Sequence, residues 1–199
     1  MKTVFFDVDT QIDFMYPAGS LYVPGAESIV DRIVVLNLFA ASHAIPVIST
    51  VDAHSGDDPE FKQWPHHCVV GTTGQQKCGG TLLQKRAVIP NSPGSPAIAG
   101  VQQIVVEKQT VDAFSNLNLR AVLEELRADR FVVYGVVTEI CVKHAALGLR
   151  KTGASVEVVT DAIRSLSDEA GRAALAEFTQ AGCALTTVAR VCETQSHQM

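Results

Sequence analysis

Three residues of this chain could together cleave an amide bond with a cysteine nucleophile: Asp9, Lys108 and Cys141. A free thiol is mostly protonated at neutral pH, so it needs a base to become a good nucleophile. A carboxylate within hydrogen-bonding reach can take that proton, and a nearby ammonium group stabilises the thiolate and holds the carboxylate in place. The set suits attack on an amide carbonyl, with the proton passed on to the leaving amine.

The local sequence around Cys141 favours a reactive thiol. Residues 131–146 predict a buried strand, a turn at Gly135 and a helix that begins at Thr138. Cys141 would lie in the first turn of this helix, where backbone N–H groups lack partners and the positive end of the helix dipole favours a thiolate. The alternative is a cysteine that only packs as a small hydrophobic residue.

A second group of residues has the chemistry of metal ligands. Asp52 and His54 are two positions apart in an extended segment, so both side chains can face one ion. His67 could add a second imidazole, and Glu60 could add a carboxylate oxygen. Such ligands suit a divalent ion such as zinc, iron or manganese. His66 is adjacent to His67, so we expect only one of the two to point inward; the alternative is a pair of histidines on a surface loop.

Two aromatic residues are candidates for holding a flat substrate. Trp64 is the only tryptophan and lies in a long loop, and Phe14 follows the segment that carries Asp9. Aromatic faces stack on planar rings, although either residue could instead belong to the core.

The elements that must position these residues alternate along the chain. The predicted strands cover residues 3–8, 46–51, 103–106, 130–136, 155–160 and 183–188, and the predicted helices cover 27–43, 116–128, 138–152 and 167–181. Ser167 suits the N-cap of the last helix, and Gly182 suits the residue after its end. Strands that are apolar on both faces predict an α/β protein of three layers, with a six-stranded parallel sheet in the Rossmann-type order 3-2-1-4-5-6 between two layers of helices.

The candidate residues all follow strands of this sheet. Asp9 follows the first strand, and Asp52 and His54 follow the second. Lys108 follows the third strand and Cys141 the fourth. Ligands of parallel sheets bind beyond the carboxyl ends of the strands, near the point where the strand order reverses. We therefore expect these residues to meet at one edge of the sheet.

Length and composition indicate one domain over residues 1–199, with a long, irregular active-site loop region at about 52–100. The chain has 199 residues, of which 47% are hydrophobic, which suits one full core. Its net charge of -5 gives no basic surface for nucleic acid. No apolar run reaches the roughly 18 residues of a membrane span. We expect no nucleic-acid or membrane partner; a homo-oligomer is compatible with the apolar faces that such sheets expose.

The cysteines and the N-terminus predict the cytoplasm as the location. Five cysteines are scattered along the chain without a CxxC pair, which indicates a reducing compartment. The first residues, MKTVFFD, turn acidic too soon for a signal peptide.

The motifs together resemble the isochorismatase-like cysteine hydrolases, and within them the nicotinamidases. Residues 9–14, DTQIDF, look like the D-x-Q-x-D-F segment of that family. Residues 52–54 and 64–72, DAH and WPHHCVVGT, are similar to its metal segment and its W-P-x-H-C run. Residues 135–142, GVVTEICV, are similar to its G-x-A-T-x-x-C-V elbow. The matches keep the family order and span most of the chain.

The resemblance implies a catalytic set with Asp9 as base, Lys108 as its electrostatic partner and Cys141 as nucleophile. It also implies a cis peptide bond at Val136–Val137 that turns a backbone N–H toward the reacting carbonyl. Together with the N–H of Cys141, this group would form an oxyanion hole.

The resemblance further implies hydrolysis of a small carboxamide, with nicotinamide as the first choice of substrate. Ammonia would leave and a thioester would form; an alternative is another small amide or ureido compound. A divalent metal, zinc first and Fe²⁺ or Mn²⁺ as alternatives, would hold the pyridine nitrogen, and two aromatic residues would flank the ring. The metal ligands would be Asp52, His54, His67 and, at a variable position, Glu60; the ring would lie between Phe14 and Trp64.

The chain departs from the family pattern where the substrate would bind. Val137 stands where alanine is usual and adds bulk. Residues 71–100 form a loop rich in Gly and Pro, and residues 109–115 lack the glycine-rich continuation that is common in nicotinamidases.

Two other classes of function are compatible with parts of the sequence. Asp7 and Asp9 form a DxD on the first strand, as in phosphatases of the haloacid dehalogenase type. Those enzymes need a later acidic pair for magnesium, whereas Asp57 and Asp58 precede Lys108. The other alternative is a non-catalytic binding protein on the same fold.

Overall fold

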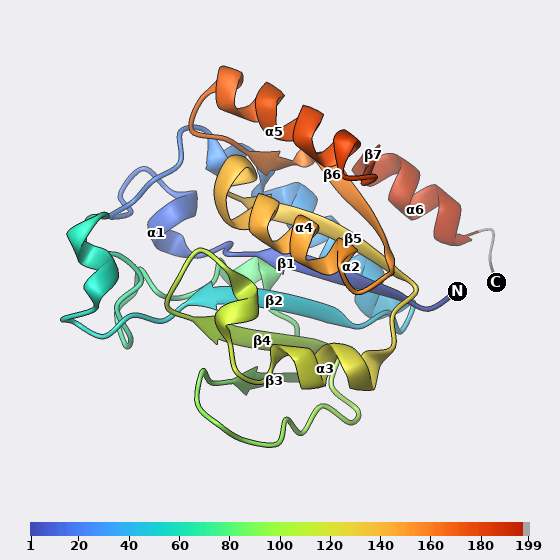
Figure 1. Ribbon diagram of the computed structural model, residues 1–199, viewed down its shortest axis with the longest axis horizontal. Helices are drawn as coiled ribbons and strands as arrows, with labels where there is room; N and C mark the ends of the chain where they lie inside the picture. Colours follow the sequence, from blue (N-terminus) through green and yellow to red (C-terminus); the bar gives the residue numbers. More distant parts are fainter. Residues whose placement is uncertain (197–199) are drawn as a thin grey trace.

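A computed structural model describes residues 1–196 as a parallel sheet with helices on both faces (Figure 1). The strands are β1 Thr3–Val8, β2 Val47–Asp52, β3 Arg86–Ile89, β4 Gln103–Lys108, β5 Arg130–Val136, β6 Ser155–Arg164 and β7 Ala184–Thr186. The helices are α1 Ile12–Met15, α2 Val30–Ser42, α3 Leu119–Leu126, α4 Lys143–Arg150, α5 Asp168–Gln180 and α6 Val188–Ser196. The predicted domain limit at residue 199 lies outside the described residues.

The sheet has seven strands in the order β3-β4-β2-β1-β5-β6-β7. The predicted α/β class and the relative order of the six predicted strands are confirmed, but the number six is wrong. The added strand, β3, pairs with β4 at the edge of the sheet, inside the segment predicted to be irregular. It has only four residues, and Arg86 and Val88 are exposed, so it lacks the apolar pattern of a buried strand.

The helices α1 and α6 were not predicted either, and the remaining differences lie at element ends. The helix expected at 138–152 begins with a π-helical turn, Thr138–Val142, before α4. The last predicted strand is shortened to β7, and α6 follows it. Ser167 is the N-cap of α5, as predicted, because its side chain accepts a hydrogen bond from the N–H of Ala170. Among the described residues no helix is both long and apolar enough to cross a membrane.

The two faces of the sheet are covered by different helices. On one face, Phe6 and Val8 of β1 belong to the core that α3, α4 and α5 cover. On the other face, Phe5 belongs to the core that α2 and α6 cover. Successive residues of a strand point to opposite faces, so the continuous apolar run of β1 fills both cores. The sheet is thereby largely buried on both faces, which leaves its ends to carry the exposed and functional polar side chains.

The strand order reverses beside β1, at the centre of the sheet. β2, β4 and β3 lie, in this spatial order, on one side of β1, and β5, β6 and β7 lie on the other (Figure 1). The chain builds the first side and then crosses over to the second. β1 pairs in parallel with both β2 and β5. A crevice at such a reversal is the usual ligand site of a parallel sheet. Asp9 and Cys141 follow the two strands that border it.

Gly135 of β5 brings the backbones of β1 and β5 unusually close at this point. Its φ is +118°, and it is the register partner of Val8. A Cβ atom at position 135 would lie 2.1 Å from the carbonyl oxygen of Val8. Only a residue without a side chain fits there, immediately before Asp9 on one strand and before the Cys141 segment on the other.

We expect Gly135→Ala to lower the free energy of unfolding by about 3 kcal/mol or more, because the new methyl group would add a steric clash to an unfavourable φ. Gly153→Ala is the matched control, since φ there is +92° but nothing lies within 4 Å of the added atom. It should lose only the backbone cost, about 1–2 kcal/mol. Urea unfolding measures both values, and equal losses for the two variants would contradict the close approach.

Candidate active site

Lys108 is at the centre of the polar groups that gather beyond the carboxyl ends of the strands. Its Nζ lies 2.9 Å from Oδ2 of Asp9 and 3.9 Å from Sγ of Cys141. It also donates a hydrogen bond to Oδ1 of Asp52, its register partner across β2 and β4. Burial alone would lower the pKa of Lys108, but the carboxylates of Asp52 and Asp9 raise it well above its ordinary value. The side chain is therefore a permanent positive charge.

The surroundings of Cys141 disfavour the thiolate. Burial raises the pKa of Cys141 well above its ordinary value, and the ammonium of Lys108 offsets only part of that effect. A hydrogen bond with Asp9 raises the pKa further. The helix N-terminus expected to stabilise a thiolate is instead a buried π-helical turn beside a carboxylate. A nucleophilic role for Cys141 would require the thiol to lose its proton as it reacts.

Asp9 is placed to accept that proton. Its backbone leaves β1 with φ of +49°, and its Oδ1 accepts a hydrogen bond of 2.6 Å from Oγ1 of Thr50. Burial raises the pKa of Asp9, and although Lys108 works in the opposite direction, the pKa stays above its ordinary value. A carboxylate with a raised pKa is a better proton acceptor than an exposed aspartate. Asp9 and Cys141 are thus a base and a proton donor in direct contact.

The predicted metal ligands converge next to this set. Nε2 of His54 lies 3.4 Å from Oε2 of Glu60 and 3.9 Å from Oδ2 of Asp52. Nε2 of His67 lies 3.6 Å from the same oxygen of Asp52. The ligand atoms of Asp52, His54 and His67 all lie within 4.8 Å of one another, which is close enough to hold one ion. The site is therefore capable of holding a metal.

Both histidines present Nε2 to the shared space, and Nδ1 of each lies near an oxygen on the other side. Nδ1 of His67 lies 2.7 Å from the carbonyl oxygen of Pro65, which can only accept, so Nδ1 donates this hydrogen bond. Nδ1 of His54 lies 3.1 Å from a carboxylate oxygen of Asp58. Such a carboxylate behind a histidine is a common orienting group at metal sites.

The polar atoms in this space fit a cation. Nε2 of His54 and Oε2 of Glu60 are buried and have no hydrogen-bond partner among the described residues. Buried polar atoms without a partner are costly, and acceptor atoms that face one another repel. The pKa of Asp52 is far below its ordinary value: burial would raise it, but Lys108 and the two histidines outweigh burial. A positive ion among these atoms would satisfy all of them.

A narrow cavity of about 40 Å³ joins the cysteine to the metal-ligand group. Its lining includes Cys141 and three of the predicted metal ligands, Asp52, Glu60 and His67. The two predicted aromatic residues, Phe14 and Trp64, line it as well. The remaining lining residues are aliphatic: Leu21, Val23, Val111, Val137, Ile140 and Leu166. His66 lies outside the cavity, exposed and stacked on Phe61 at 4.1 Å between ring centroids. The lining suits a flat, largely apolar molecule with a polar atom toward the metal ligands.

The peptide bond between Val136 and Val137 is cis. It lies between the end of β5 and the π-helical turn that carries Cys141, at the position that the resemblance implied.

Gln11 positions the metal-ligand group and was not predicted from the sequence. Its side-chain amide donates to the carbonyl of Asp52 at 2.8 Å and accepts from the N–H of Asp52 at 2.7 Å. It also donates to the carbonyl of Gln75 at 2.7 Å. One buried amide thus fixes the backbone of a candidate ligand to a loop distant in sequence. The motif DTQIDF contained this glutamine, but the motif alone did not show which atoms it would bind.

Asp13 and Asp58 are two further supporting residues that the sequence did not reveal. Asp13 accepts from the N–H of Cys68 at 2.7 Å and from the N–H of Ser20 at 2.9 Å, so it fixes the loop that follows His67. Asp58 is four residues after His54, a spacing that brings the two side chains together in this loop. That spacing was the one available signal.

Asp7 is not part of the site, which removes the basis for a phosphatase DxD. It lies fully buried, 3.0 Å from Nζ of Lys77, and accepts hydrogen bonds from Thr10, Asn37 and Ser49. Its carboxylate is thereby consumed in a closed network, whereas Asp9 faces Lys108. The two aspartates do not converge on one ion.

Comparison with known proteins agrees with this geometry. A family model described as the isochorismatase domain matches residues 3–190. A nicotinamidase of Escherichia coli (strain K12) is 29% identical over an alignment of 218 positions, gaps included, which covers 94% of this chain and 96% of that protein. A pyrazinamidase/nicotinamidase structure from Streptococcus mutans UA159 has a TM-score of 0.80 at 29% identity, over 92% of this chain and 99% of that one. A pyrazinamidase of Pyrococcus horikoshii in complex with zinc shares the fold, with a TM-score of 0.80 at 23% identity over 94% and 99% of the two chains.

Proposed function

Because the chain belongs to the isochorismatase family, we propose that it is a nicotinamidase, which hydrolyses nicotinamide to nicotinate and ammonia with Cys141 as nucleophile. The observation that carries the proposal is the cavity that Cys141 shares with three candidate metal ligands, Asp52, Glu60 and His67. An amide to be cleaved and a ring atom to be held require a nucleophile and a metal ion within one narrow site. Two relatives at 29% identity that are named nicotinamidases support the choice of substrate.

We assign the first half of the reaction to Cys141 and Asp9. The sulfur attacks the amide carbonyl carbon while the thiol proton moves to the carboxylate of Asp9, so no free thiolate has to exist in the buried site. The carbonyl oxygen becomes negative, and we assign its stabilisation to the backbone N–H groups of Val137 and Cys141. Asp9 then gives the proton to the amide nitrogen, the C–N bond breaks, ammonia leaves and a thioester remains on the sulfur.

The second half returns the enzyme to its starting state. A water molecule attacks the thioester carbonyl while Asp9 takes one of its protons. The C–S bond breaks, the sulfur regains a proton from Asp9, and the carboxylic acid leaves and ionises in water. Lys108 keeps its charge throughout and holds Asp9 in position, and it stabilises negative charge on the sulfur during both bond changes.

We assign Asp52, His54, His67 and Glu60 as ligands of a divalent metal, and we propose zinc because paired imidazoles with carboxylates suit it. When bound there, the ion would supply a Lewis-acid contact for the pyridine nitrogen of the substrate. Phe14 and Trp64 would flank the ring. This arrangement orients the amide toward Cys141, and orientation of reacting groups lowers the barrier directly.

The experiment that tests this function compares nicotinamide with benzamide, which keeps the ring and the amide but lacks the ring nitrogen. We expect ammonia release from nicotinamide with a kcat/KM about 100-fold above that for benzamide, since one charge-assisted contact is worth about 1.5–3 kcal/mol. In His67→Ala the metal content of the purified protein should fall and the preference for nicotinamide should shrink. The histidine one position earlier provides the control.

His66→Ala should keep both the metal content and the preference, because His66 is exposed and stacks on Phe61. Metal content is measured by elemental analysis and the preference by steady-state ammonia release. If His67→Ala retains metal and preference, the metal assignment fails. If the wild-type protein releases no ammonia from nicotinamide but cleaves another small amide or ureido compound, the substrate assignment fails and the cysteine mechanism stands.

A further inference from the structure

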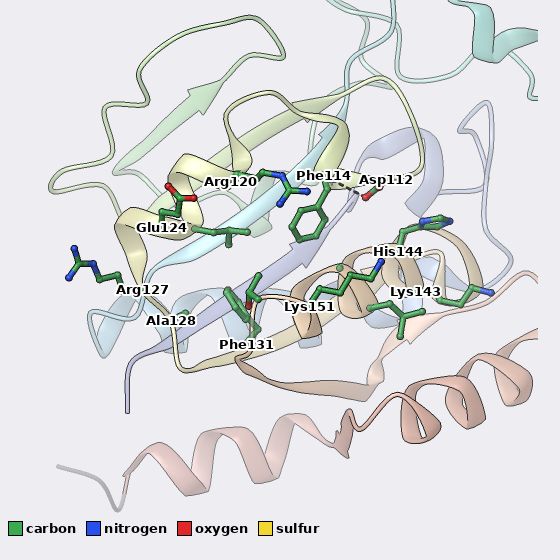
Figure 2. A pocket seen from close by; sticks show the side chains of 14 residues that line it. Asp112, Phe114, Arg120, Glu124, Arg127, Ala128, Phe131, Lys143, His144 and Lys151 are labelled. Atoms are coloured by element: carbon green, nitrogen blue, oxygen red, sulfur yellow. Dashed lines mark hydrogen bonds between the residues drawn. The ribbon is translucent and has the colours of Figure 1, made fainter.

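A second, much larger hollow lies between α3 and α4, and we call it the α3–α4 groove (Figure 2). Its volume is about 740 Å³, within the range of sites that bind small ligands. None of its lining residues lines the cavity at Cys141. The groove therefore has no part in the proposed hydrolysis. It is lined by Asp112, Phe114, Arg120, Leu123, Glu124, Arg127, Ala128, Phe131, Lys143, His144, Leu147, Gly148, Lys151 and Thr152.

Part of the groove lining is apolar and includes the half-buried aromatic ring of Phe114. Phe114 follows Asp112, whose carboxylate caps the short turn by accepting from the N–H of Phe114 at 2.9 Å. The ring packs against Gly148 of α4, where an added Cβ would lie 2.2 Å from Cε2 of Phe114. Leu123 and Leu147 line the groove beside it. The absence of a side chain at Gly148 thus makes room for a ring that offers a flat surface.

The walls of the groove carry an excess of positive charge. Four basic residues line it, against two acidic ones, on a chain whose net charge is -5: Arg120, Arg127, Lys143 and Lys151, against Asp112 and Glu124. Lys143 is partly neutralised, since its Nζ lies 3.2 Å from Glu177. In the described part of the chain, Arg120 and Lys151 are not within ion-pair distance of a carboxylate. These two cations are therefore available to an anion.

Arg120 and Lys151 lie on either side of the Phe114 ring (Figure 2). The guanidinium carbon of Arg120 lies 5.9 Å from the ring centroid, so the cation already contacts the aromatic face. Lys151 directly follows α4 on the opposite wall. An aromatic surface between two unpaired cations is complementary to a ligand that combines a flat ring with a multiply charged anion.

The geometry points to the α3–α4 groove as a site for a nucleoside diphosphate, with the base on Phe114 and the phosphates bound by Arg120 and Lys151. Neither part of such a ligand alone uses the whole groove. An inorganic phosphate would leave the apolar floor uncovered, and a neutral nucleoside would leave both cations without a partner. The proposal is independent of the hydrolytic function, because Arg120 and Lys151 contact no residue assigned to that reaction.

Calorimetric titration of the full-length protein with ADP tests the proposal. We expect saturable binding of one ADP per chain with a Kd below about 1 mM. Adenosine alone and inorganic phosphate alone should each bind at least about ten-fold more weakly, because each lacks one set of contacts. Arg120→Gln and Lys151→Gln should each weaken ADP binding by about ten-fold, the effect of losing one charge-assisted hydrogen bond.

Lys85→Gln is the matched control, because Lys85 is an exposed lysine outside the groove and its loss should leave ADP binding unchanged. All three substituted positions are exposed, so the variants should fold, as thermal unfolding will verify. The proposal is overturned if ADP does not bind saturably at about 1 mM, or if phosphate binds as tightly as ADP. It is overturned as well if Lys85→Gln weakens binding as much as Arg120→Gln, since the attraction would then be general rather than local.

Discussion

Cys141→Ala should reduce ammonia release from nicotinamide by at least about 10⁴-fold in kcat, the scale on which loss of a covalent nucleophile acts. The reason is that the other side chains bonded to Asp9 carry a hydroxyl group (Thr50) and an ammonium group (Lys108), and neither replaces a thiol as nucleophile. The variant should still fold, because the change removes one sulfur atom from a nearly buried side chain. The measurement is steady-state ammonia release with the fold checked by circular dichroism.

Cys183→Ala is the control for Cys141→Ala. Cys183 is also buried and burial also raises its pKa, but it lies in the core beside Phe178 and does not line the cavity. Its substitution should leave kcat within about two-fold while costing a similar, small amount of stability. Full turnover by Cys141→Ala would show that the thiol is not the nucleophile, and the proposed function would then have to be abandoned.

Lys108→Met should cost both activity and stability. It leaves the buried carboxylates of Asp9 and Asp52 without their shared cation, and removing one partner of a buried ion pair costs about 3–5 kcal/mol. It should also lower kcat by about 10³-fold or more, since the base loses its positioning group and the reacting sulfur loses its counter-charge. Urea unfolding measures the first effect and ammonia release by the folded fraction measures the second.

Lys77→Met separates these two effects. Lys77 is the other buried lysine of the structure's described part with a carboxylate partner, Asp7, at 3.0 Å. We expect a comparable loss of stability from this variant, but a kcat within about ten-fold of the wild type in the protein that remains folded. Equal losses of kcat in the two variants would mean that Lys108 acts only through the fold.

The sequence predicted that Asp9, Lys108 and Cys141 gather at one edge because each ends or follows a strand. Parallel strands end at a common edge, so apolar runs followed by Asp9, Lys108 and Cys141 determine that these side chains meet near one another. The same logic predicted Asp52 and His54. It could not predict the charge state of the thiol, because the pKa depends on how completely the surrounding side chains exclude water, and that is a property of the packed structure.

The supporting residues and the edge strand were not predictable for related reasons. Gln11 and Asp58 act by hydrogen bonds to atoms of distant or folded-back segments, and a sequence shows such a partner only after the loop path is known. β3 is short, and two of its four residues are exposed, so its apolar pattern is too weak to separate it from a loop. The α3–α4 groove likewise depends on the close packing of Phe114 against Gly148, which lie far apart in the chain.

The most direct test of the central claim is to identify the residue that carries the acyl group during turnover. The enzyme would be mixed with saturating nicotinamide, quenched in acid within the first turnover, digested and analysed by mass spectrometry. The mechanism predicts a nicotinoyl thioester on the peptide that contains Cys141, absent from the Cys141→Ala variant. An acyl group on another residue, or full turnover while Cys141 stays unmodified at every quench time, would contradict it.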